Sequence, residues 1–319
     1  MDDRHLEKSI LSTICYFDMF DYPLTLLEIW QWLFIDQPSN QVVSLSAIRQ
    51  ILESSRYLSE KLSFQNGFYF LKNRDAIVLT RLKRYALAGD KNKIAQKGVR
   101  LLKFLPFIRL IGLCNNSGNN NIRADSDIDL FIITAKNRLF TARFLITLAI
   151  SFRRLRRHGR KVTDRLCLSF YVAEDDLDFS KIKIMADDIY LTYWIANLFP
   201  LYDRQAYARF LAQNDWIKNY LPNYLPKTGS FWRRIDDSWL SLLSFKVSEH
   251  FLSGWLGDQL EKFLKTIQLF KMSKNNKSLA QASDSRVIIS ETMLKFHEND
   301  RRLFYQKNFL DKLKGIISQ

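Results

Sequence analysis

The sequence predicts an α+β chain in which a small mixed sheet, flanked by helices, lies between two mainly helical regions. Three short runs, Phe107–Cys114, Asp127–Thr134 and Arg165–Ala173, are apolar and rich in β-branched or aromatic residues, as strands are. Longer segments on either side repeat apolar residues at helical spacing. The chain has 319 residues, of which 47% are hydrophobic, so we expect about two or three domains.

Residues 1–72 begin with three predicted helices. Apolar side chains recur at helical spacing over residues 5–19. Thr25 and Glu28 have the spacing of a capping box, which places the start of a second helix there. The segment Ser44–Glu53 predicts a third helix.

A hairpin is predicted after these helices. Residues 57–63 and 68–71 are apolar runs on either side of Asn66-Gly67, a strong signal for a two-residue hairpin turn. Three helices and a hairpin are typical of a winged helix, whose third helix usually enters the DNA major groove. Here the third helix carries Arg49 as its only cation, together with Glu53. We therefore expect the winged-helix-like domain to contact protein or to be structural, although DNA binding stays an alternative.

A basic segment joins this domain to the sheet. Residues 73–106 are rich in lysine and arginine and predict one or two helices, which we treat as a basic helical connector. The whole chain has a formal net charge of +15. Such an excess attracts phosphate-rich partners such as RNA or DNA, although a generally basic proteome or a solubility margin also explains it.

Two aspartates open the second predicted strand. Residues i and i+2 of a strand project from the same face, about 6.6 to 6.8 Å apart along it. Asp127 and Asp129 therefore present their carboxylates together, with Ile128 turned the opposite way. Mg²⁺ binds carboxylate oxygens together with substrate phosphates, and a rigid pair can hold two metal ions about 3.5 to 4 Å apart. The alternative is that the aspartates only keep the start of a buried strand solvated.

This part of the chain resembles the DNA polymerase β-like nucleotidyltransferase superfamily. The family pattern is a strand, a Gly-Ser turn, a polar spacer, and Asp-x-Asp opening the next strand. Residues 126–130, Ser-Asp-Ile-Asp-Leu, fit the second half of that pattern. Asn115-Asn116 stand where Gly-Ser is expected, and Ser117-Gly118 follow directly. The resemblance covers residues 107–204.

The resemblance implies a nucleotidyltransferase core in which Asp127 and Asp129 are catalytic and hold Mg²⁺, with a two-metal site possible. It implies that an NTP lies against the turn and the start of the second strand, at Asn115, Asn116, Ser117, Gly118 and Ser126. The implied reaction moves a nucleoside monophosphate from the NTP to an unidentified hydroxyl acceptor. The partners would be the nucleotide and an acceptor such as RNA, DNA or a partner protein.

The third predicted strand departs from the family. Members usually carry a third carboxylate on this strand, whereas here Ser169 lies in its middle, with Asp164 just before and Glu174 just after. Without that acid, an attacking hydroxyl loses its usual base. The alternative function is a catalytically weakened relative that binds nucleotide or nucleic acid as a regulatory or interaction module.

A dense positive run, Arg153–Lys161, follows the helix predicted over 138–155. It is either a solvated helix end or a phosphate-facing rim beside the site. Beyond the third strand we predict a helix at 187–198 and a short edge strand at 200–203.

Residues 205–319 are assigned to a mainly helical C-terminal domain. Its large aromatic side chains are expected to be core residues: Trp232, Trp239, Phe245, Phe251, Trp255 and Phe263. Near its end, a polar cluster is predicted either to contact a phosphate or to cap a helix: Lys295, His297, Asp300, Arg301 and Arg302.

Nothing in the sequence indicates export or a membrane span. Acidic residues occupy the N-terminal stretch, where a signal peptide would be basic and then apolar. The longest apolar tract, Phe144–Phe152, is far shorter than the ~20 residues of a span. Cys15, Cys114 and Cys167 each lie in an apolar segment, as reduced core cysteines do. We therefore expect a cytoplasmic protein with no membrane partner.

Overall fold

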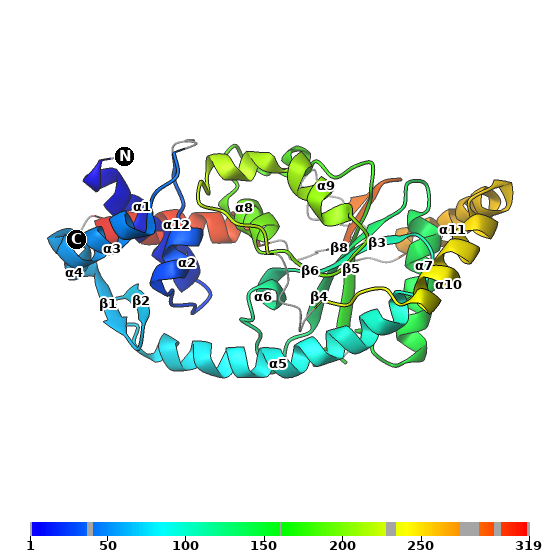
Figure 1. Cartoon of the computed structure of the whole chain (residues 1–319), viewed down its shortest axis with the longest axis horizontal. Helices are drawn as coiled ribbons and strands as arrows, with labels where there is room; N and C mark the ends of the chain where they lie inside the picture. The colour runs from blue at the N-terminus through cyan, green and yellow to red at the C-terminus, as the bar shows by residue number, and fades with distance from the viewer. Residues whose placement is uncertain are drawn as a thin grey trace.

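A six-stranded mixed sheet lies at the centre of the computed structural model, which describes residues 2–36, 41–159, 161–227, 234–274, 287–296 and 301–317 (Figure 1). Its strand order is β6-β3-β4-β5-β8-β7. The β4–β5 pair is parallel and the other pairs are antiparallel. The strands are β3 (Ile108–Leu113), β4 (Ile128–Thr134), β5 (Leu166–Ala173), β6 (Phe199–Asp203), β7 (Val287–Ile289) and β8 (Met293–Phe296). The predicted α+β class and mixed sheet are thus confirmed.

The N-terminal part contains the predicted helices and hairpin: α1 (Asp3–Asp18), α2 (Leu26–Gln31), α3 (Leu45–Ser54), α4 (Arg56–Lys61), β1 (Leu62–Gln65) and β2 (Phe68–Leu71). The capping box is present, because Thr25 and Glu28 bond reciprocally through side chain and backbone. Asn66 and Gly67 have φ values of 51° and 83°, the left-handed pair that a tight hairpin turn requires. The strand predicted over residues 57–63 is wrong for residues 57–61, which are helical. Ser55 accepts a hydrogen bond from Leu58 N and so starts a further helix there.

The basic connector forms one long helix, α5 (Ala76–Leu102), which runs beneath both the N-terminal part and the sheet (Figure 1). Arg81 joins α5 to α2 through two bonds to the Glu28 carboxylate, at 2.6 and 2.8 Å. The same guanidinium lies 4.1 Å from the ring centroid of Tyr22. These contacts fix the position of α5 against the N-terminal part.

Helices lie on both faces of the sheet. The helices after α5 are α6 (Asn115–Gly118), α7 (Leu139–Phe152), α8 (Ile189–Ala196), α9 (Ala206–Gln213), α10 (Trp239–Leu252), α11 (Trp255–Ser273) and α12 (Arg302–Ile317), with short 3₁₀ turns at Phe179–Ile182 and Asp215–Asn219. One hydrophobic cluster joins the sheet residues Phe131 and Phe170 to Trp194 of α8 and to Phe17 of α1. A second cluster on the other face contains residues of α5, α7 and α11. The N-terminal part and the sheet therefore share a continuous core.

The C-terminal region does not form the separate helical domain that was predicted for residues 205–319. Its strands β7 and β8 extend the central sheet, and α12 packs against α1 and α8. Helices α10 and α11 lie at one end of the molecule, where α11 packs against α7 (Figure 1).

The expectation that the C-terminal aromatic residues are core is also wrong for most of them. Trp239, Phe251, Trp255 and Phe263 are 72%, 69%, 70% and 62% exposed. Phe245 is half-buried. Trp232, His297 and Asp300 lie outside the described residues.

The cysteines match the sequence-based expectation in burial and bonding. Cys15, Cys114 and Cys167 are buried and form no disulfide. In the part of the chain that the structure describes, no helix has both the length and the apolar character to cross a membrane.

Candidate functional site

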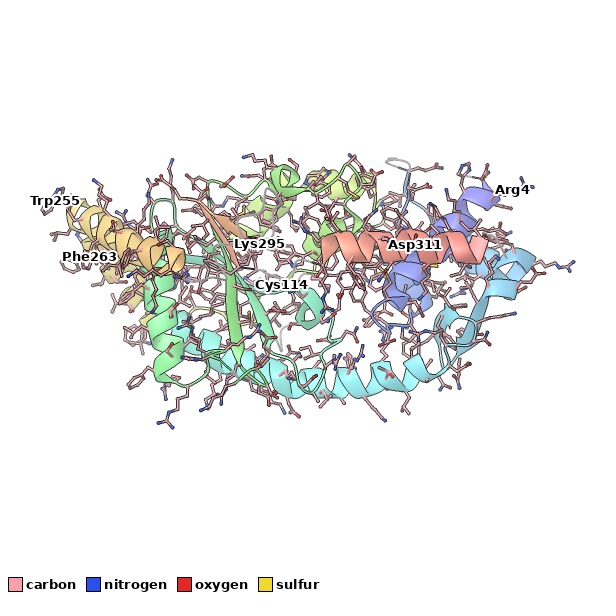
Figure 2. The ribbon with its side chains drawn as sticks, turned by 180° about the vertical axis from the view of Figure 1, so that it is seen from behind. Arg4, Cys114, Trp255, Phe263, Lys295 and Asp311 are labelled. Atoms are coloured by element: carbon pink, nitrogen blue, oxygen red, sulfur yellow. The ribbon has the colours of Figure 1, made fainter. Side chains whose placement is uncertain are left out.

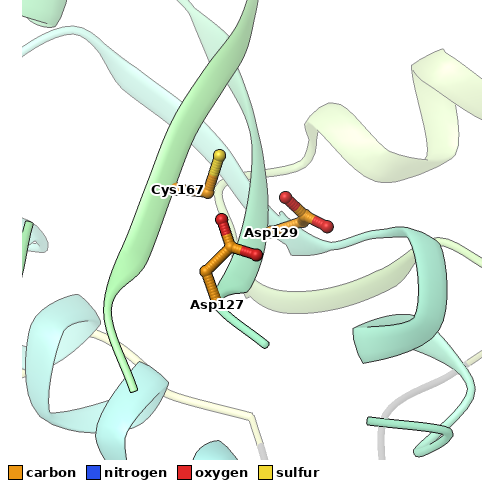
Figure 3. A group of neighbouring side chains, drawn as sticks. All are labelled: Asp127, Asp129 and Cys167. Carbon is orange, nitrogen blue, oxygen red and sulfur yellow. The ribbon is translucent and has the colours of Figure 1, made fainter. Parts of the chain in front are cut away.

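The two predicted aspartates lie at the start of β4, on the face of the sheet covered by α8. Asp127 directly precedes the strand and Asp129 is its second residue, whereas Ile128 turns to the opposite face and is buried there. Ligand atoms of Asp127, Asp129 and Cys167 lie within 4.8 Å of one another (Figure 3). The two carboxylates therefore lie together, as the strand spacing predicts.

Cys167 is the member of this group that sequence reasoning missed. The parallel pairing of β4 and β5 sets Cys167 beside Asp129, and the register then shifts before Phe131 and Phe170. Its Sγ donates to Ser169 Oγ at 3.4 Å. Burial and the Asp129 carboxylate raise the pKa of this thiol to about 12, so it is protonated at neutral pH. No local pattern marks Cys167, because its place depends on the pairing of two distant strands.

Asp129 is held in an environment that opposes its charge. Burial, followed by the neighbouring Asp127 carboxylate, raises the Asp129 pKa. Asn115 Nδ2 donates to Asp129 Oδ2 at 2.9 Å and, like the more distant Arg157, favours the ionised form. The backbone N–H of Asp129 also donates to Ser117 Oγ at 3.4 Å.

The turn between β3 and β4 contains a backbone conformation that glycine usually adopts. Asn115 has φ 53°, a left-handed value that asparagine tolerates better than most residues. Gly118 serves close packing, since a Cβ there would lie 2.4 Å from the carbonyl oxygen of Asn197. Asn116 contributes its carbonyl, which accepts from Asn121 N at 3.0 Å. The turn therefore places Asn115 and Ser117 against Asp129.

The loop that leads into Asp127 is held by a buried lysine of α5. Lys91 is 3% exposed, and its Nζ donates to the carbonyl oxygens of Ala124 and Ser126 at 3.0 and 2.6 Å. The Ser126 hydroxyl donates to Arg123 O at 2.9 Å, within the same loop. Ser126, predicted to bind the nucleotide, thus has a hydroxyl that closes the loop beside Asp127.

One arginine of the positive run reaches the site. Arg157 Nη1 donates to Asp127 Oδ2 at 2.7 Å and lies 3.8 Å from Cys167 Sγ. The run follows α7, which ends at Phe152, and its backbone pairs beside β5. Arg153, Arg154 and Arg156 are exposed, and Arg160 lies outside the described residues. The run is therefore mostly solvated but contributes one cation to the carboxylate pair.

Neither acid that flanks the third strand completes the site. Asp164 pairs with Lys91 Nζ at 3.1 Å. Glu174 lies at the opposite end of β5, where it pairs with Arg209 at 2.6 Å and Arg109 at 3.5 Å. Among the described residues, no third carboxylate joins Asp127 and Asp129.

A pocket with a basic lining opens on the other side of Asn115. Its volume is about 180 Å³, and its lining includes Lys295, Arg301 and Arg302. Tyr190 stacks on Tyr305 with ring centroids 5.3 Å apart, and its hydroxyl donates to Asn115 Oδ1 at 3.4 Å. The structure thus brings together three members of the predicted polar cluster, and it places them beside the turn. Arg302 is also paired with Asp188 at 3.2 Å.

A scan against protein-family models, a search of curated proteins and a search of solved structures each find no match for this chain. The functional assignment therefore depends on the geometry of the site.

Proposed function

We propose that this chain is a Mg²⁺-dependent nucleotidyltransferase that moves a nucleoside monophosphate from an NTP to a hydroxyl acceptor. The observation that carries the proposal is the carboxylate pair of Asp127 and Asp129 at the start of a central strand, directly beside the Asn115–Gly118 turn. The buried thiols fit a reducing cytoplasm, where we expect the protein to act.

The donor set of the site fits a hard cation. Asp127 and Asp129 offer the carboxylate oxygens that Mg²⁺ prefers, and in such sites substrate phosphates and water supply the other ligands. The Cys167 thiol is soft and protonated, so we do not count it as a ligand. Arg157 now neutralises Asp127, and we expect its guanidinium to turn toward the triphosphate when a cation is held there.

The basic pocket beside Asn115 supports the same proposal. Lys295, Arg301 and Arg302 line it, and none of the described residues in its lining is acidic. These cations favour the binding of an anionic group of the nucleotide or of the acceptor beside Asn115. Asn115 lies between the two regions, because its amide contacts the Asp129 carboxylate and its carbonyl accepts from Tyr190.

In the proposed reaction, the acceptor hydroxyl oxygen attacks the α-phosphorus of the NTP. The bond to pyrophosphate breaks, and the hydroxyl proton passes to solvent. Bound Mg²⁺ would neutralise the triphosphate and favour ionisation of the attacking hydroxyl. Asp127 and Asp129 would hold the cation, Asn115 orients Asp129, and Arg157 adds positive charge beside Asp127.

One observation favours a second function, that of a weakened, nucleotide-binding relative. The position beside Asp129 on β5 holds Cys167 in place of a carboxylate. With a pKa of about 12, this thiol is no base for the acceptor hydroxyl at neutral pH. Such a protein would bind an NTP or a nucleic acid through the same surface and act as a regulatory or interaction module.

A transfer assay separates the two functions. The wild type and the Cys167→Asp variant are incubated with Mg²⁺, each of four labelled NTPs, and RNA, DNA, protein or small hydroxyl acceptors. If the chain is a nucleotidyltransferase, we expect transfer by the wild type and an at least about tenfold faster rate in Cys167→Asp. Cys167→Ser is the matched control. NTP binding without transfer in either form supports the binding function, and the absence of both removes the proposal.

A further inference from the structure

The α10–α11 hairpin exposes an apolar face at one end of the molecule, where Trp255 and Phe263 project outward (Figure 2). On α11, exposed apolar residues recur at helical spacing: Leu256, Phe263, Ile267 and Phe270 are 67%, 62%, 46% and 61% exposed. On α10 the same pattern is formed by Leu240, Leu243, Val247 and Phe251, which are 50%, 53%, 47% and 69% exposed. An apolar surface of this extent marks an interaction site.

The opposite side of the hairpin is bonded to the body of the protein. Glu261 accepts from the backbone N–H groups of Phe140 and Thr141, both at 2.8 Å, at the start of α7. Glu249 pairs with Arg109 at 2.8 Å, and Asp258 pairs with Arg138 at 2.6 Å. Every acid in α10 and α11 is therefore engaged by the core.

The lysines of the hairpin are distributed differently from its acids. Lys246, Lys262 and Lys271 are exposed, and within the described part of the chain none of them forms an ion pair. Lys265 pairs with Glu291, and Lys274 lies 4.2 Å from the centroid of the Phe270 ring. The outer surface of the hairpin is thus aromatic, aliphatic and positively charged.

We propose that this face binds the surface of an anionic lipid bilayer, in contrast to the expectation from the sequence that the protein has no membrane partner. Helices that lie in a membrane interface combine an apolar face bearing Trp, Phe and Leu with flanking lysines, and anionic lipids attract those lysines. Helices of 14 and 19 residues suit this role without spanning the bilayer. The charge pattern argues against a second copy of the chain, because a two-fold contact would bring lysines of both copies together while the acids of the two helices are already engaged. This inference does not depend on the proposed transfer reaction.

Vesicle flotation of the full chain tests the proposal. We expect the protein to float with vesicles that contain phosphatidylglycerol, and to do so at least tenfold less with pure phosphatidylcholine at ordinary salt. The double variant Trp255→Glu/Phe263→Glu should lose binding. The triple variant Lys246→Glu/Lys262→Glu/Lys271→Glu should weaken it at least about tenfold and flatten its salt dependence.

Matched controls replace equally exposed residues elsewhere. Phe64→Glu in β1 and Leu79→Glu in α5 alter residues that are 61% and 57% exposed, and both variants should float like the wild type. Circular dichroism confirms that each variant folds. Absence of flotation with either vesicle, or normal flotation of the Trp255/Phe263 variant, would overturn the proposal. So would a change from dimer to monomer in that variant without vesicle binding, because the face would then join two copies.

Discussion

At the scale of single residues, the site combines charges that the fold does not favour on its own. Asp129 is half-buried beside Asp127, and Arg157 offers partial compensation from a half-exposed position. Like charges held close together are retained where they serve binding, at the expense of stability. Asn115 supplies both the left-handed backbone and the amide that orients Asp129.

The raised pKa of Asp129 gives a prediction about stability and pH. When the pH is below 3.8, the ordinary pKa of an aspartate, this carboxyl is protonated in both the folded and the unfolded chain. Its raised pKa then has no effect on the stability of the fold. As the pH rises from 3.8 through the raised pKa, the unfolded chain ionises more readily, and the folded state loses stability. Asp129→Asn should therefore have a higher melting temperature than the wild type at pH 7, with the gap closing toward pH 3.

Thermal unfolding followed by circular dichroism at several pH values checks this sign. Asp215→Asn is the matched control, because its carboxylate is 59% exposed and pairs with the exposed Lys218. A lower melting temperature for Asp129→Asn than for the wild type at pH 7 would mean that the Asp129 charge stabilises the fold, contrary to this expectation.

At the scale of elements, α5 connects the N-terminal part to the site. Arg81 bonds to Glu28 in α2, and three turns later Lys91 bonds to the loop before Asp127. Because Lys91 is buried, replacing its ammonium group takes a charged donor away from the carbonyl oxygens of Ala124 and Ser126. The loop that positions Asp127 then loses its contacts to α5 through Lys91.

Lys91→Met keeps most of the side-chain volume and removes these bonds. We expect it to lower the free energy of unfolding by about 2 kcal/mol and to weaken nucleotide binding. Lys93→Met on the same helix should leave both unchanged, since Lys93 is exposed and pairs only with Asp90. Urea denaturation measures the first effect and calorimetry the second. Equal behaviour of the two variants would contradict the role given to Lys91.

The elements that could be predicted from the sequence are those with strong local signals. The Thr25–Glu28 capping box and the Asn66-Gly67 turn each act over a few residues, and both are confirmed. The strand at residues 128–134 is indicated by its apolar run after two aspartates. By contrast, β7 and β8 have only 3 and 4 residues, too few to show a period, and they form because the edge of β5 is available.

The parts of the site that escaped prediction depend on tertiary pairing. Cys167 joins the carboxylates only through the register of two parallel strands, and Arg157 through the path of the chain after α7. The aromatic residues of α10 and α11 were expected in the core because a helical apolar pattern does not distinguish a buried face from an exposed one.

At the scale of the whole molecule, the N-terminal part and the sheet are one cooperative structure. Tyr193 of α8 donates through its hydroxyl to Trp32 O at 2.7 Å, and Val43 N donates to Asn223 Oδ1 at 2.9 Å. Helix α12 returns from the end of the chain to pack on α1. A domain that shares its core in this way is not expected to unfold alone.

We therefore predict one unfolding transition for the N-terminal part and the sheet. Scanning calorimetry should show a single main peak, and tryptophan fluorescence and far-ultraviolet circular dichroism should give coincident midpoints. Two well-separated transitions, one of them reproduced by residues 1–72 in isolation, would contradict the continuous core.

We propose that Asp127 and Asp129 form the binding site for a metal–nucleotide complex. Titration calorimetry with ATP and Mg²⁺ on the wild type, Asp127→Asn and Asp129→Asn, with Asp215→Asn as the control, measures this binding. We expect binding to the wild type and to the control, and a loss of affinity of at least about tenfold, or ~1.4 kcal/mol, in each of the two site variants. Unchanged affinity in both site variants, with their folds intact, would contradict it.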